Sequence, residues 1–176
     1  MTKTSEFLQS VRDGNWTEAS ALVHSGDVDS SIPSPSHSVL TWLIELDAPT
    51  TLIVDLLNLL VRKESIDPNS MGLLDTCLDF AMNRANAFST FVALLDYGLS
   101  PNVIISGGCT LFQKAIELNR VHEVEALLKH GVDPDQMSVF GRESTSNLDE
   151  ATSAENAAGR IAIETWQRNN AVRRIP

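Results

Sequence analysis

Cysteine is scarce in this sequence, and its two residues stand far apart. Only Cys77 and Cys109 occur among the 176 residues. Neither belongs to the paired spacing of a zinc site, and two cysteines are too few for the framework of a disulfide-rich domain. We therefore expect no disulfide and no metal site. We also expect the chain to work in a reducing compartment, either the cytoplasm or the nucleus.

Long hydrophobic runs are also lacking. No stretch approaches the roughly 20 apolar residues that are needed to cross a bilayer. The first residues of the chain are polar apart from Phe7 and Leu8, so they lack the apolar core of a secretory signal. We expect neither a membrane-spanning segment nor a signal peptide.

Basic residues are few as well. Lysine and arginine number 13 against 23 aspartates and glutamates, which gives a net charge of −10 and a pI of about 4.7. Nucleic acids and anionic membranes are bound by clusters of basic side chains, so we expect neither as a partner. A neutral or basic protein partner suits the charge, although the acidity would also serve solubility alone. We expect a monomer.

The short motifs that bring catalytic groups together are absent. The sequence has no HExxH, GxSxG, P-loop or GxGxxG, and its histidines are scattered at positions 24, 37, 122 and 130. We therefore expect no enzyme and no cofactor. A cysteine and a histidine that meet only in the folded chain stay open as a nucleophilic pair.

What the sequence does have is internal similarity. Residues 91–102 and 124–135 superpose without a gap at an offset of 33. The matched pairs are Gly98 with Gly131, Pro101 with Pro134, and Leu94-Leu95 with Leu127-Leu128. The same offset before Pro101 falls on Pro68. A fixed period of this length indicates an array of similar structural units.

One unit shows how the chain would fold. Residues 110–118 carry apolar side chains at helical spacing, and residues 121–130 do so again. Between them Asn119 tolerates the left-handed conformation that closes a helix, and Gly131 can end the second helix in the same way. Pro134 then prevents the helix from continuing. The pattern predicts a pair of helices whose apolar face must be buried against neighbouring pairs.

Residues 108–115, Gly-Cys-Thr-Leu-Phe-Gln-Lys-Ala, resemble the G-x-T-P-L-H-x-A signature of the ankyrin repeat, with Leu111 and Gln113 at its proline and histidine. Residues 131–135 resemble the ending of that repeat. The resemblance implies an all-α, ankyrin-type solenoid of stacked antiparallel helix pairs with β-turn fingers. A tetratricopeptide array is the alternative, but its W-x-x-L-G-x-x-Y pattern is absent.

We expect a single ankyrin-type domain over residues 1–176. Residues 76–81 and 159–166 are interpreted as further copies of the signature, and a helix is expected from Asp149 to Ala158. The second helix after residue 166 is expected to be short or absent. The units cover approximately residues 4–30, 37–69, 75–102, 109–135 and 159–176. The last unit is a half repeat, and an insertion over residues 136–158 precedes it.

Ankyrin-type arrays generally bind proteins through their fingers and the concave face of their first helices, and the resemblance implies the same here. Ile104 and Ile105 occupy fingertip positions that the family usually fills with polar residues, so they are candidate contacts unless they fold onto a neighbouring finger. The predicted partner-binding residues are Ile32, Met71, Ile104, Ile105 and Phe140, with Ser34 as an alternative to Ile32.

The resulting prediction is a protein–protein interaction module that acts as an adaptor, scaffold or inhibitor. One alternative is an enzyme or small-molecule binder that has recruited the scaffold, which would carry a deep pocket lined by polar side chains. Another is the regulatory N-terminal domain of a longer protein. Because one fold serves many functions, the sequence does not identify the partner.

Overall fold

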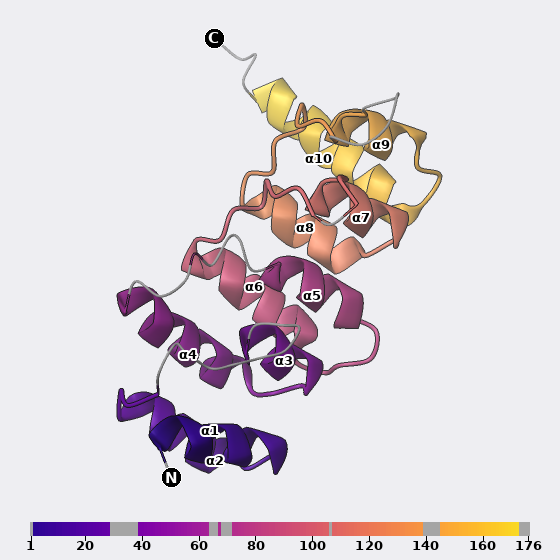
Figure 1. Cartoon of the computed structure of the whole chain (residues 1–176). Coiled ribbons are helices and arrows are strands. Elements are labelled where there is room, and N and C mark those ends of the chain that lie inside the picture. Colours follow the sequence, from indigo (N-terminus) through magenta and orange to yellow (C-terminus); the bar gives the residue numbers. More distant parts are fainter. Residues whose placement is uncertain are drawn as a thin grey trace. The chain divides into compact units, whose positions relative to one another are not determined.

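The computed structural model describes residues 2–28, 39–63, 67, 72–105, 107–138 and 145–172, without the side chains of 169–172. Within these ranges the chain forms ten helices and no strand (Figure 1), which confirms the predicted all-α class. None of the helices is both long and apolar enough to cross a membrane. The chain divides into two compact units, residues 1–97 and 98–176.

The first unit contains three pairs of helices. They are α1 (Lys3–Arg12) with α2 (Trp16–His24), α3 (Val39–Glu45) with α4 (Thr50–Arg62), and α5 (Leu73–Phe80) with α6 (Ala87–Tyr97). The second helices contact one another in the order α2, α4, α6, and α3 contacts α5. This unit therefore has one helical layer of α2, α4 and α6 and a second layer that includes α3 and α5, and α1 packs on α2.

Apolar side chains from both layers fill the core of the first unit. Four of its fully buried members are Phe7 of α1, Leu43 of α3, Leu56 of α4 and Phe91 of α6, each with no exposed surface. These side chains recur at helical spacing with polar residues between them, so each helix presents an apolar stripe to its neighbours.

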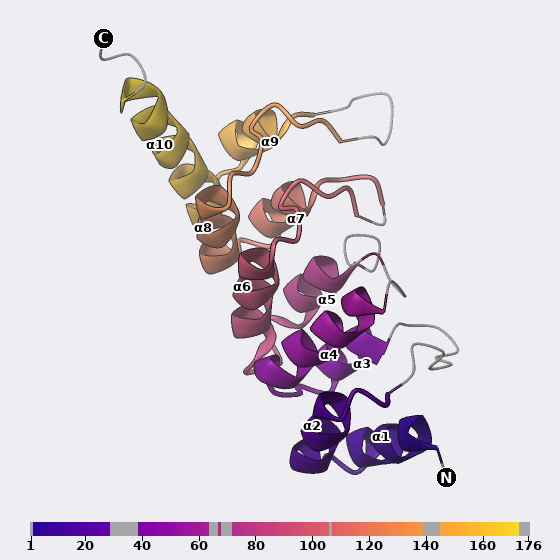
Figure 2. The same ribbon diagram turned by 90° about the vertical axis from the view of Figure 1, so that its left-hand side faces the viewer.

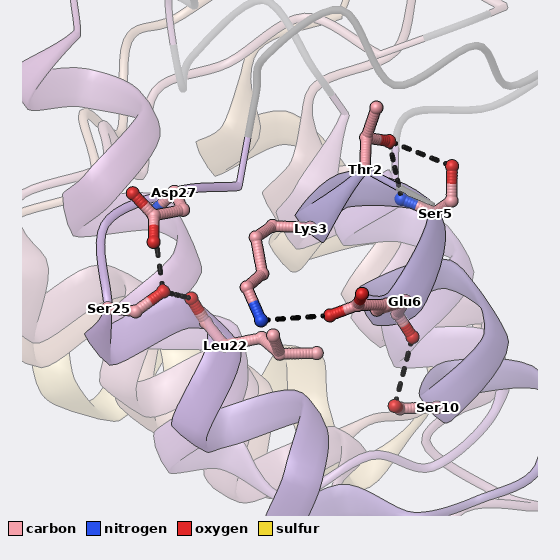
Figure 3. Close-up of polar contacts among 8 residues, drawn as sticks. All are labelled: Thr2, Lys3, Ser5, Glu6, Ser10, Leu22, Ser25 and Asp27. Carbon is pink, nitrogen blue, oxygen red and sulfur yellow. Dashed lines mark hydrogen bonds and ion pairs between the residues drawn. The ribbon is translucent and has the colours of Figure 1, made fainter.

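Local polar contacts hold the first turns of α1 (Figure 3). The Thr2 hydroxyl accepts a hydrogen bond from the Ser5 backbone N–H at 3.2 Å, which caps the helix. One turn later the Ser10 hydroxyl donates to the Glu6 carbonyl at 3.0 Å, and Lys3 lies 3.0 Å from the Glu6 carboxylate. These contacts within α1 and its N-cap stabilise the start of the helix locally.

The second unit contains two further pairs. They are α7 (Leu111–Glu117) with α8 (Val121–Lys129), and α9 (Asn147–Ser153) with α10 (Ala157–Val172). α7 contacts α9 and α8 contacts α10, so this unit also has two layers. Its core includes Phe112, which is fully buried and lies 5.3 Å from Trp166 between ring centroids.

The same turn closes the first helix of three pairs, across both units. The second residue after the helix takes a left-handed conformation, and the next residue donates its N–H to the carbonyl five residues back. The turn residues are Gly14 (φ 67°), Asp47 (φ 58°) and Asn119 (φ 53°), and the bonds are Asn15 to Ser10, Ala48 to Leu43 and Arg120 to Ala115, at 2.8, 3.0 and 2.8 Å. This pattern satisfies carbonyls at a helix end.

A contact between neighbouring pairs follows from this turn in both units. In the first unit, the Asp47 carboxylate accepts a hydrogen bond from the Asn86 backbone N–H at 2.8 Å, just before α6. In the second unit, the Asn119 side-chain oxygen accepts one from the Ala158 N–H at 3.2 Å, in the first turn of α10. The left-handed residue therefore also sets the spacing to the next pair.

The expectation of a terminal half repeat from Gly159 is wrong. The helix predicted over 149–158 is α9, which ends at Ser153, and α10 then runs for 16 residues and packs on α9. The break comes at Ala154, whose backbone is extended (φ −73°, ψ 116°). Gly159 lies inside α10, where a Cβ would come within 2.9 Å of the Ala151 carbonyl. It is thus a close-packing glycine.

The signature assigned to residues 76–81 is displaced by one helical turn. α5 begins at Leu73 after Gly72, so Thr76 lies within the helix, whereas Thr110 lies at the N-cap of α7. The buried pair Leu73-Leu74 therefore takes the place that Leu111-Phe112 have in α7. The turn after α5 is correspondingly longer, because α6 begins only at Ala87.

Candidate functional site

Two short hairpins of the second unit lie on the side of α7 and α9 (Figure 2). In the first hairpin, residues 103–105 pair with 109–111 through an Ile104–Thr110 bridge, and Ile105 N–H donates to the Cys109 carbonyl at 3.0 Å. In the second hairpin, residues 136–138 pair with 145–147 through a Met137–Ser146 bridge. Each hairpin leads directly into a helix, so its end is fixed by that helix.

The helices begin with the same hydrogen-bonded motif. Thr110 caps α7 and exchanges hydrogen bonds with Gln113, while Ser146 caps α9 and exchanges them with Asp149. The two hydrogen bonds from Ser146 lower the pKa of the Asp149 carboxyl, because they favour its charged form. The motif joins each hairpin rigidly to its helix.

Buried polar side chains connect the two hairpins. Asn147, at the start of α9, has no exposed surface; its side-chain oxygen accepts a hydrogen bond from the Thr110 hydroxyl, and its amide donates to the Asp133 carbonyl at 2.7 Å. The Gln113 amide donates to the Thr145 carbonyl at 2.8 Å. These bonds run between residues far apart in sequence and fix one hairpin relative to the other.

Two of the five predicted partner-binding residues lie in the described part of the chain. Ile104 is 40% exposed on the first hairpin, and Ile105 is half-buried beside it. Ile32, Met71 and Phe140 lie outside the described residues, and so does Ser34.

Met137, which the sequence interpretation missed, occupies on the second hairpin the bridge position that Ile104 occupies on the first. It is 46% exposed. It follows Ile104 by one 33-residue period, so extending the repeat into the supposed insertion would have identified it. The structure thus gives the two hairpins one exposed apolar side chain each, at corresponding places.

A surface hollow of about 410 Å³ adjoins the hairpins. Its lining is mostly polar and comes from both hairpins, α7 and α9: Gly107, Cys109, Gln113, Glu117, Ser138, Thr145 and Glu150. Burial and the nearby Glu117 carboxylate raise the pKa of Glu150. The hollow therefore holds two carboxylates that repel each other.

Glu150→Gln is expected to raise the melting temperature at pH 7. The folded-state pKa of Glu150 lies above its unfolded value, so the ionised carboxylate lowers stability once the pH exceeds the folded pKa, and this cost disappears when the group is protonated in both states. Thermal unfolding followed by circular dichroism between pH 7 and pH 4 would show a difference from wild type that shrinks with acidity. A variant that melts lower at pH 7 would contradict this sign.

Cys77, His24 and His130 have ordinary structural surroundings. Burial raises the pKa of the Cys77 thiol, so Cys77 packs as a small apolar side chain. The His130 ring nitrogen lies 2.8 Å from the Ala126 carbonyl, and His24 lies 3.6 Å from Asp55. In the part of the chain that is described, no three His, Cys, Asp or Glu residues are arranged to hold a metal ion.

No protein-family model matches the chain, and no curated protein matches its sequence. The case for a function therefore depends on the geometry of the hairpins and the hollow.

Proposed function

We propose that this chain is an ankyrin-type repeat protein that binds a partner protein through the hairpins of its second unit. Paired helices in two layers, a left-handed turn that recurs in three pairs and hairpins that precede capped helices all support an array of this kind. The partner is proposed to be neutral or basic, the location cytoplasmic or nuclear, and the role that of an adaptor, scaffold or inhibitor without catalysis.

The observation that carries the proposal is the exposure of Ile104 and Met137 on two fixed hairpins. Single exposed apolar residues are common, but two at corresponding positions of adjacent hairpins form a repeated feature. Backbone hydrogen bonds next to each residue already hold the hairpins, from Ile105 N–H to the Cys109 carbonyl and from Ser138 N–H to the Thr145 carbonyl, both at 3.0 Å. Binding would therefore lose little conformational entropy, which favours affinity.

The test compares two double variants of the full chain. Ile104→Asp/Met137→Asp places a charge on each hairpin. The control Leu46→Asp/Leu118→Asp places the same charges at two inter-helix turns. Leu46 and Leu118 are 39% and 43% exposed, which is similar to the exposure of Ile104 and Met137. Proteins captured by each variant from cells that express the chain are quantified by mass spectrometry. We expect the hairpin variant to lose a partner that the turn variant and the wild type retain, with about a tenfold or greater loss of affinity.

Circular dichroism would establish that both variants are folded. Equal capture by wild type and hairpin variant, or loss of the partner in the turn variant alone, would overturn the proposed binding surface.

A further inference from the structure

We propose that the partner binds as an extended segment, which adds a strand to the second hairpin along the edge that carries Met137. The inference rests on the proposed function and names the backbone conformation in which the partner is recognised. The observation behind it is the direction in which the backbone N–H and C=O groups of this hairpin point.

Two hydrogen bonds of the second hairpin, which leads into α9 (Figure 2), flank the Met137–Ser146 bridge without involving either bridged residue. They run from Ser138 N–H to the Thr145 carbonyl and from Asn147 N–H to the Gln136 carbonyl, at 3.0 Å each. Successive residues of an antiparallel strand direct their backbone groups to opposite sides. The N–H and C=O of Met137 therefore both point away from the paired strand.

The opposite edge of the hairpin is closed by its own helix. Ser146 also points its backbone groups outward, but its N–H donates to the Asp149 carboxylate at 3.1 Å and its carbonyl accepts from the Glu150 N–H at 3.0 Å. In the part of the chain that the structure describes, no hydrogen bond reaches the N–H or C=O of Met137. The hairpin thus has one closed edge and one open edge.

The open edge continues to Asp135, two residues before Met137. The Asp135 N–H donates to the Asp133 side chain at 2.9 Å, whereas no hydrogen bond among the described residues reaches the Asp135 carbonyl. Backbone groups two residues apart in a strand face the same neighbour. The edge therefore offers one donor and two acceptors at alternate residues, which is the spacing that an added strand requires.

The first hairpin shows what occupies the corresponding edge one period earlier. Its Asn102 corresponds to Asp135, and the Asn102 carbonyl accepts a hydrogen bond from the Gln136 side-chain amide at 3.1 Å. The second hairpin thus already reaches the edge of the first. We therefore assign the added strand to the second hairpin.

An open edge favours an extended partner over a helical one. Unpaired N–H and C=O groups along a strand are a template for pairing with another chain, and strand addition satisfies them with main-chain hydrogen bonds. A helix uses its own backbone groups internally, so a helix that covered this edge would bury unpaired groups, which is unfavourable. Met137, 46% exposed, would then contact a neighbouring apolar side chain of the added strand.

The first experiment tests the backbone of the bound segment. Linear peptides are selected from a random displayed library on the full wild-type chain, and one that loses binding to Ile104→Asp/Met137→Asp is kept. Each of its residues is then N-methylated in turn, and affinity is measured by fluorescence polarisation. We expect two sites spaced by two residues to lose about tenfold in affinity, because each loses a donated hydrogen bond, and the site between them to change by less than about twofold.

The second experiment tests the edge of the hairpin. Met137→Pro removes the outward N–H, which proline permits at an open strand edge, while Met137→Ala shortens the side chain and keeps that N–H. We expect about tenfold weaker binding of the selected peptide to Met137→Pro than to Met137→Ala, with circular dichroism showing that both are folded. In the wild-type chain, hydrogen exchange of the Met137 N–H should slow by about tenfold or more with bound peptide, whereas Ser138 N–H, already bonded, should change less.

The outcomes separate this inference from the function on which it rests. A peptide that depends on Ile104 and Met137 but shows no alternation on N-methylation, and no protection of the Met137 N–H, would overturn strand addition and leave the proposed function intact. Protection that rises with the concentration of the chain alone would assign the edge to a second copy and overturn the extended partner. Failure to select any peptide that depends on Ile104 and Met137 would overturn both.

Discussion

Asn147→Ala is expected to lower the free energy of unfolding by about 1–3 kcal/mol, because the buried Thr110 hydroxyl loses its acceptor and the Asp133 carbonyl loses one of its two donors. Thr110 is 1% exposed, so water does not readily replace the acceptor that its hydroxyl loses. The Asp133 carbonyl would lose the amide that donates to it at 2.7 Å and keep the Gln136 N–H at 3.3 Å. Urea denaturation followed by circular dichroism measures the change.

Asn83→Ala is the matched control, because Asn83 is exposed and its replacement should change stability by no more than about 0.5 kcal/mol. Hydrogen exchange would locate the effect of Asn147→Ala, with loss of protection at the Asn147 and Ser138 N–H groups that pair the second hairpin. Equal destabilisation by the two variants would show that Asn147 does not connect the hairpins.

The helix pair of residues 110–131 was predictable because its signals are local. Apolar spacing placed both helices, and the structure has them at Leu111–Glu117 and Val121–Lys129. Asn119 was expected to tolerate a left-handed turn, and its φ is 53°. Gly131, expected to end the second helix, has a φ of 80°. Each of these residues determines the backbone conformation only of its near neighbours in the sequence. A single sequence is therefore enough to predict these helix ends.

The helix pair of residues 147–172 was harder to predict because tertiary contacts replace the local pattern. Asn147 occupies the helix-starting position that Leu111 has in α7 and is just as fully buried. A polar residue there breaks the apolar spacing, and only its bonds to Thr110 and Asp133 explain it. The capping box of Ser146 and Asp149 was the available signal for the start of α9.

The displacement of α5 has a different cause. Thr76 and Cys77 stand beside each other as Cys109 and Thr110 do, and this similarity suggested a shared helix start. The helix begins a turn earlier, at Leu73, because Gly72 takes a left-handed conformation (φ 61°) before it. A longer turn after Phe80 then restores the period, so the second helix α6 keeps its expected place. The period of the whole unit was therefore a better guide than any single motif.

For the candidate site too, the residues marked by local sequence signals were predictable, and those brought together by tertiary contacts were not. Ile104 could be recognised because an apolar β-branched residue is unusual at an expected ankyrin fingertip, although the structure places it at the bridge position before the tip. Met137 follows from the period. The hollow could not be predicted, because Glu117 and Glu150 approach each other only when α7 packs on α9. No spacing rule brings together two residues from different helix pairs.

Gly159→Ala is expected to lower the free energy of unfolding by about 1–3 kcal/mol, which is the cost of inserting a methyl group into a packed core. The sign is diagnostic, because alanine in place of glycine within a helix ordinarily stabilises it by about 1 kcal/mol. Here the new Cβ would lie 2.9 Å from both the Ala151 carbonyl oxygen and the Ala154 Cβ. Since a carbonyl of α9 cannot move without shifting the helix, α9 and α10 must separate. Urea denaturation measures the loss.

The double variant Ala154→Gly/Gly159→Ala separates the contact with the Ala154 methyl from the contacts with backbone carbonyls. Removing the methyl leaves the carbonyl oxygens of residues 151 and 154 in place, at 2.9 and 3.0 Å from the new Cβ, so we expect only partial recovery. Full recovery would assign the clash to the side chain of residue 154 alone. A stabilised Gly159→Ala single variant would mean that α9 and α10 do not pack closely at this point, and the pairing of these two helices in the second unit would then be wrong.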